Sequence, residues 1–105
     1  MQISELREML ELDPEDVELR YALGLHLLED DDGDPKEAVE HLSNVLEIEP
    51  GHVASHLALG QAYMRLGKDD EARETLEDGL QVAQQLQHGQ GHDLVPQFEE
   101  LLAEL

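Results

Sequence analysis

The chain has 105 residues, with 26 acidic against 6 basic side chains, so its formal net charge is −20. A hydrophobic content of 40% is enough for a core, which argues against a wholly disordered acidic tail and favours one domain over residues 1–105. The absence of cysteine excludes a disulfide framework, and the strong negative charge opposes binding to nucleic acid.

The first predicted helix spans residues 2–13. Its apolar side chains recur at steps of three and four residues, as one face of a helix requires, and Asp13-Pro14 ends it. This face consists of Ile3, Leu6, Met9, Leu10 and Leu12. We expect this helix to be the second half of a helical hairpin whose first half is missing.

Residues 15–50 contain two further predicted helices. The apolar face of the first helix includes Val17, Leu19, Leu23, Leu27 and Leu28. The second helix begins at Asp34-Pro35, where an N-cap acceptor precedes a proline whose missing N–H costs nothing. It ends at Glu49-Pro50-Gly51, and its apolar face consists of Ala38, Val39, Leu42, Val45, Leu46 and Ile48.

Residues 51–84 repeat this pair of helices. Leu23-Gly24 recurs 36 residues later as Leu59-Gly60, and Ala38 recurs 34 residues later as Ala72. The difference of two residues falls in the acidic stretch 29–32, where a turn can absorb it. A period near 34 residues is typical of helix–turn–helix repeats that stack into a solenoid.

A sixth helix is predicted for residues 93–105. The preceding repeat helix is expected to continue through Gln87, before Gly89-Gln90-Gly91 interrupts it. The stripe of the sixth helix consists of Leu94, Val95, Phe98, Leu101, Leu102 and Leu105. Because a terminal repeat exposes an apolar face, we expect this helix to cap the stack.

The segment Leu57–Ala72 closely resembles the signature of the tetratricopeptide repeat (TPR) family, and the resemblance extends over roughly residues 2–82. It implies an all-α, right-handed α-solenoid. Small residues allow the paired helices to approach closely, with a larger residue filling the space beside them; these are Gly24, Gly60, Ala38 and Ala72, and then Tyr63. Arg20 and His56 stand at the family's usual tryptophan position, and Gln84 replaces the proline that leads into a further repeat.

The resemblance also implies a place for a partner. TPR arrays use the concave face lined by the first helix of each pair, which here carries Tyr21, Leu25, Leu28, Leu57, Gln61, Met64 and Arg65. The lysines and asparagines with which chaperone-binding members hold terminal carboxylates are missing. We therefore expect an adaptor or scaffold that binds a peptide or helix presenting apolar groups. The alternatives are a homodimer formed through the same surface, and coverage of that surface by the chain's own terminal helices.

No residue pattern predicts catalysis, a metal site or a cofactor. The candidate nucleophiles Ser4, Ser43, Ser55 and Thr75 do not stand in a strained turn, and no phosphate-binding loop is present. The spacing of His52 and His56 suits a metal, but packing or surface roles are favoured. Asp30–Asp34 fails as a calcium loop because the two ends of an aligned site are apolar.

The acidity has two interpretations. It is the composition of a protein that stays soluble in a high-salt cytoplasm, or it attracts a basic partner. The spread of acidic residues over every predicted helix favours the halophilic interpretation. No apolar run approaches the roughly 20 residues that span a bilayer, and no signal peptide is recognised, so we expect a cytoplasmic protein.

Overall fold

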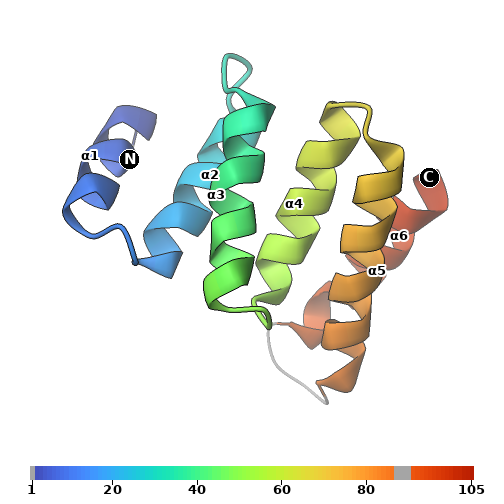
Figure 1. Cartoon of the computed structure of the whole chain (residues 1–105). Helices are drawn as coiled ribbons and strands as arrows, with labels where there is room; N and C mark the ends of the chain where they lie inside the picture. Colours follow the sequence, from blue (N-terminus) through green and yellow to red (C-terminus); the bar gives the residue numbers. More distant parts are fainter. Residues whose placement is uncertain (1, 87–90) are drawn as a thin grey trace.

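The computed structural model describes residues 2–86 and 91–105, which form six α-helices and a 3₁₀ turn without any strand (Figure 1). The helices are α1 (Ile3–Leu12), α2 (Val17–Glu29), α3 (Pro35–Ile48), α4 (Val53–Arg65), α5 (Asp69–Gln85) and α6 (Val95–Glu104). The predictions of an all-α fold and of a helical solenoid are confirmed.

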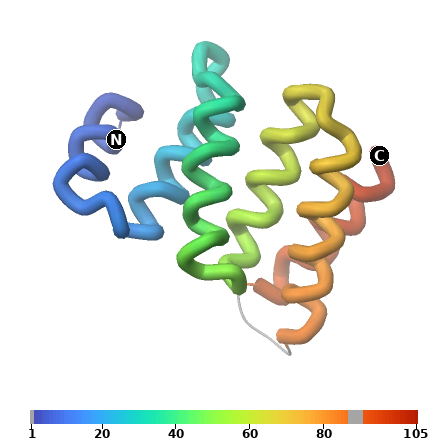
Figure 2. The backbone as a smooth tube through the Cα atoms, viewed as in Figure 1, coloured from blue at the N-terminus to red at the C-terminus, as the bar shows by residue number. Residues whose placement is uncertain are grey.

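Each helix packs against the next along the chain, and α2 also contacts α4. In Figures 1 and 2, α3 lies in front of α2, and α5 lies in front of α6. One core cluster joins α1, α2, α3 and α4, and a second joins α4 and α5 to α6. The second cluster shows that the C-terminal helix packs against the repeat hairpin before it.

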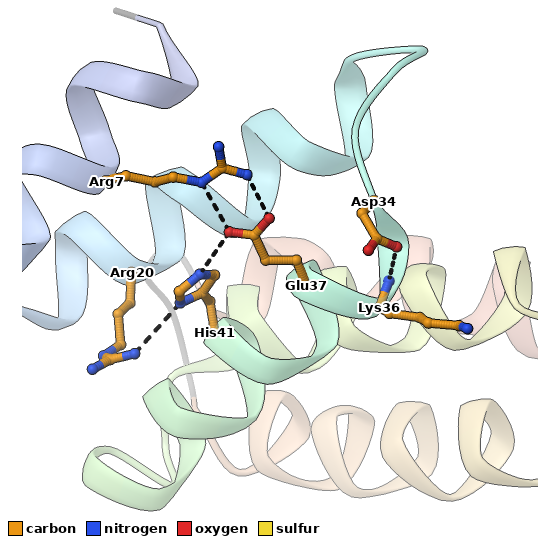
Figure 3. A network of polar contacts seen from close by, with 6 residues as sticks. All are labelled: Arg7, Arg20, Asp34, Lys36, Glu37 and His41. Carbon is orange, nitrogen blue, oxygen red and sulfur yellow. Dashed lines mark hydrogen bonds and ion pairs between the residues drawn. The ribbon is translucent and has the colours of Figure 1, made fainter.

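Side-chain caps fix where the helices of the first hairpin begin. Asp16 accepts a hydrogen bond from the backbone N–H of Leu19 at 3.1 Å, and Asp34 accepts one from Lys36 at 3.0 Å (Figure 3). In the turn between α2 and α3, Asp30 accepts a bond from the backbone N–H of Asp32 at 2.9 Å. The carboxylates of Asp30 and Asp34 therefore hold the turn and the start of the following helix.

Small residues lie where the paired helices meet. A Cβ built on Gly24 would lie 2.7 Å from Cγ of Leu42, and Gly60 faces Leu76 in the same way in the next hairpin. Ala38 and Ala72 are fully buried, while Tyr63 is half-buried against the first core cluster. Side chains larger than these would push the helices of each hairpin apart.

Arg20 and His56, which the resemblance places at a usual tryptophan position, make the same kind of hydrogen bond, one in each repeat. Arg20 donates from Nε to the carbonyl oxygen of Pro14 at 3.0 Å. His56 makes the corresponding bond from Nε2 to the carbonyl oxygen of Pro50, also at 3.0 Å. Because a carbonyl oxygen can only accept, the His56 proton is on Nε2. Each residue thus ties the first helix of its repeat to the junction preceding it.

The C-terminal part differs from the prediction in its boundaries. Helix α5 ends at Gln85, and a 3₁₀ turn at His92–Leu94 precedes α6, so the regular helix begins at Val95 and not at residue 93. Pro96 stands in the first turn of α6, where a missing N–H is tolerated. The predicted continuation of α5 through Gln87 is wrong at Leu86, whose backbone is extended, while Gln87 itself and the predicted break at Gly89-Gln90 lie outside the described residues.

A chain of polar contacts attaches α1 to the first repeat (Figure 3). Arg7 donates to both carboxylate oxygens of Glu37, with Nε 3.1 Å from Oε2. His41 donates from Nε2 to the same carboxylate at 3.3 Å and accepts a bond from Arg20 at 3.4 Å. The hydrogen bond from Arg7 is the largest influence on the pKa of Glu37 and lowers it. Partial burial acts in the opposite direction, but the bond from His41 adds to the lowering, so the pKa of Glu37 lies below its ordinary value.

We expect Arg7→Met to destabilise the protein in a pH-dependent way. A carboxylate whose pKa is lower when folded stabilises the fold above its unfolded pKa, and this contribution is lost as the pH falls through the folded pKa. The difference in unfolding free energy between the two proteins should therefore be full above about pH 4.5, the ordinary value for glutamate, decline as the pH falls below it, and vanish once the pH is below the lowered pKa of Glu37 in the folded protein. For a solvent-exposed pair it should be about 0.2–1 kcal/mol.

Denaturant unfolding at several pH values measures this difference. Arg65→Met, which removes the same charge from another helix, is the control, because general repulsion changes equally in both variants. An Arg7→Met effect that persists at pH 2, or that equals the control at every pH, would contradict the assignment.

Candidate interaction surface

Helices α2 and α4 carry the seven residues that were predicted to bind a partner. Gln61 and Arg65 are exposed, and Tyr21, Leu25 and Met64 are half-buried. These five side chains are accessible in full or in part, so they remain candidates for contact with a partner.

The expectation of an exposed position is wrong for Leu28 and Leu57. Leu28 is 5% exposed and packs in the first core cluster, and Leu57 is 8% exposed and packs in the second. The second cluster also contains Phe98 from α6 and has Met64 packed against it. The C-terminal helix therefore takes part in covering the predicted binding surface, which is one of the alternatives that the sequence left open.

A hollow of about 300 Å³ lies between the C-terminal halves of α2 and α4, with the largely buried Leu28 among its lining residues. We call it the groove hollow, and it is lined by Leu25, Leu28, Glu29, Gln61 and Arg65. Four of these five residues belong to the predicted set. They are spaced three or four residues apart on each helix, which places them on one face. The hollow thus combines an apolar floor with one acidic and one basic side chain.

A second cavity of about 390 Å³ lies at the other end of α2 and α4. We call it the junction pocket, and it is lined by Glu18, Tyr21, Glu49, Gly51, His52, Val53, Ala54, Leu86, Gly91 and Leu94. Of the predicted set, this pocket contains only Tyr21. The sequence could not reveal it, because its walls come from four separate segments that only the packing of the hairpins brings together.

The centre of the junction pocket is a capping histidine. His52 accepts bonds at Nδ1 from the backbone N–H and the hydroxyl of Ser55, at 3.3 and 2.8 Å. Its Nε2 lies 3.6 Å from the carboxylate of Glu18, and its ring centroid lies 5.0 Å from that of Tyr21. His52 therefore begins α4 and also holds the ring of Tyr21 at the pocket wall.

Glu18, His52 and Ser55 have the order of an acid, a base and a nucleophile, but the arrangement does not suit catalysis. Ser55 has no exposed surface, so a substrate carbonyl could not reach its hydroxyl. The Glu18 side chain is 79% exposed and is not buried behind the imidazole. The three side chains are accounted for by the cap of α4.

Carboxylates from both hollows act on the hydroxyl of Tyr21. Burial raises the pKa of its hydroxyl, and the carboxylates of Glu18 and Glu29 raise it further. Glu18 lines the junction pocket, and Glu29 lines the groove hollow. The phenol is therefore neutral at physiological pH and presents both a hydroxyl and an aromatic face.

His52 and His56, which have the spacing of metal ligands, have separate partners. His56 is 8% exposed, and its Nε2 is engaged with Pro50, whereas His52 is engaged with Ser55 and Glu18. Within residues 2–86 and 91–105, no cluster of three or more potential ligands is positioned to hold a metal ion. No helix in this part of the chain is long and apolar enough to cross a membrane.

Comparison with known proteins identifies the repeat. A model of the tetratricopeptide repeat family matches residues 31–95, which is more than half of the chain. No curated protein sequence is detectably similar to the chain.

Solved structures of the same fold are similar over most of the chain. The solution structure of a tetratricopeptide repeat domain protein from Salinibacter ruber has a TM-score of 0.72 at 27% identity and covers 88% of both chains. A crystal structure of a tetratricopeptide repeat domain protein from the same organism gives 0.71 at 25% identity, covering 85% of this chain and 93% of that one. The crystal structure of MamA protein gives 0.70 at 23% identity, covering 84% of this chain and 49% of MamA.

Proposed function

The chain belongs to the tetratricopeptide repeat family, and we propose that it binds a helical or extended segment of a partner protein across the groove hollow. The repeat fold indicates a protein–protein interaction module of a kind that is typically non-catalytic. The observation that supports this site is the groove hollow, in which Leu25 and Leu28 from α2 face Gln61 and Arg65 from α4.

The chemistry of the hollow defines the segment that fits it. Leu25 and Leu28 offer apolar contact, and Gln61 offers amide donors and an acceptor. The carboxylate of Glu29 can form an ion pair with a basic side chain. A side chain seated there would be apolar, with lysine or arginine nearby in the sequence of the partner. The net charge of −20 favours the approach of such a basic segment over that of an acidic one.

A homodimer through the same surface is the alternative. Two copies bring together chains that each carry a charge of −20, whose repulsion opposes association. We therefore propose a basic partner as the occupant. Sedimentation at several concentrations distinguishes the two, because only self-association depends on the concentration of the chain alone.

Replacing Gln61 with Arg is expected to weaken partner binding by about tenfold or more, because it places a positive charge against a basic segment. Peptides selected on the immobilised protein from a random library provide the probe, and their affinities are measured by titration calorimetry. Gln81→Arg is the matched control, since it makes the same change at an exposed position of α5. Leu25→Asp should weaken binding as well.

The affinities are interpreted only for variants that keep the fold of the parent protein. Circular dichroism and the melting temperature should be similar for both arginine variants, because both positions are exposed. Leu57 is not suitable for such a test, since it is buried and a carboxylate there would damage the core. Equal affinities for Gln61→Arg and Gln81→Arg, or amide shifts confined to α3 and α5, would contradict the proposed site.

A further inference from the structure

We propose that the junction pocket binds the side chain of an arginine supplied by the partner. This inference rests on the proposed function, in that it identifies a second subsite for the same partner. It is carried by the juxtaposition of two glutamates, an aromatic ring and apolar walls around one cavity of about 390 Å³. That volume lies within the range of ordinary ligand pockets.

The charges of the pocket select a cation. Glu18 and Glu49 line it, and among the described residues that line it there is no lysine or arginine. The contact of Glu18 with His52 is 3.6 Å, and the Glu18 side chain is 79% exposed, so its carboxylate is accessible to a second donor. A pocket of this composition inside a chain of net charge −20 repels anions and attracts cations.

The remaining walls fit the rest of an arginine. Val53 and Leu94 supply apolar surface against which the aliphatic stem can lie, and Leu86, 40% exposed, extends that surface to the rim. The ring of Tyr21, held by His52 at 5.0 Å, offers an aromatic face on which a planar guanidinium stacks. An arginine has five donors in a rigid fork, which suits two separate carboxylates better than the single ammonium of lysine.

The location of the pocket agrees with one extended ligand. Glu18 and Leu25 are seven residues apart on α2, so the two hollows are separated by about 10 Å along the helix axis. An extended segment covers this distance in about three residues. The arginine and the apolar anchor are thus expected to stand about three residues apart in the partner.

The test uses the full ¹⁵N-labelled chain and acetyl-arginine amide as the probe, at about 0.15 M salt, so that diffuse attraction to the acidic surface is screened. The expected result is saturable shifts at the amides of Tyr21, Gly51 and Ala54. Acetyl-citrulline amide, which is nearly the same in shape but uncharged, should give no saturable shift at these amides.

Two double variants with equal net charge separate the pocket from the general field of the protein. Replacing both Glu18 and Glu49 with Gln should weaken binding of the arginine probe by about tenfold or more. Replacing both Glu74 and Glu77 with Gln, on the exposed surface of α5, should leave it unchanged. Equal effects of the two pairs, or shifts spread over all acidic helices, would overturn the proposal.

The same titration on Gln61→Arg keeps the two proposals distinct. That variant should bind the arginine probe as the parent does, while losing affinity for selected peptides. If the probe binds in the pocket but Gln61→Arg retains full peptide affinity, only the groove proposal fails. If peptides require the groove but the probe does not occupy the pocket, only the arginine subsite fails.

Discussion

Phe98→Ala is expected to destabilise the protein by about 3–5 kcal/mol, as truncation of a buried aromatic side chain usually does. Phe98 is the only phenylalanine of the chain and has no exposed surface. It is also the only residue of α6 that is fully buried. The ring of Phe98 is thus the most deeply buried contact between this helix and the second repeat, beside the partly buried Val95, Leu101 and Leu102.

The expected loss of unfolding free energy is large relative to the total stability of a small domain. Small domains are stable by about 5–15 kcal/mol, and each kcal/mol shifts the melting temperature of a domain of this size by about 4–8 °C. Thermal unfolding followed by circular dichroism measures the shift. Gln97→Ala, at the exposed neighbouring position, should change the melting temperature little. A loss below about 1 kcal/mol for Phe98→Ala would mean that α6 is dispensable for the stack.

The helices and their order could be predicted because each depends on local patterns. Asp34-Pro35 marks the start of α3, and the spacing of apolar residues gives the faces of the repeat helices. What the pattern could not provide is the burial of each apolar residue. Met9 corresponds in register to Val45, yet Met9 is 39% exposed and Val45 is fully buried. Val45 lies between the neighbouring helices on either side of α3, whereas among the described residues α1 packs chiefly against α2.

The groove could be predicted only in part, for a related reason. The repeat pattern identifies which helix faces the concave side, and four of the five residues of the groove hollow follow from it. It does not reveal how far the terminal helix reaches. Leu57 is buried in the cluster to which Phe98 belongs, and this cluster brings together residues that are 41 positions apart. Such a cluster depends on tertiary packing and has no local signal.

Gly79 illustrates the same limit, and it leads to a second large expected effect. In the register that aligns Ala38 with Ala72, Gly79 stands where the first repeat has the buried Val45. The space of that side chain is taken by Phe98, because a Cβ on Gly79 would lie 2.5 Å from Cε1 of its ring. The same Cβ would lie 2.5 Å from Cβ of His56. The glycine therefore allows α4 and α6 to approach α5 at one point.

We expect Gly79→Ala to destabilise the protein, although the same change inside an ordinary helix stabilises by about 1 kcal/mol. The Cβ of His56 is fixed to the backbone of α4, so the clash cannot be relieved by a side-chain rotation alone, and overpacking of this kind costs about 1–3 kcal/mol. Gly51→Ala is the matched control, since a Cβ there meets nothing within 4 Å, and the stability of the protein should change by less than about 0.5 kcal/mol.

In the Phe98→Ala background, the cost of Gly79→Ala should fall, because one of the two clashing groups is gone. Denaturant unfolding of the four proteins in this cycle measures the coupling. A stabilised Gly79→Ala protein, or a cost that is the same with and without the Phe98 ring, would show that α6 does not pack over Gly79 as described.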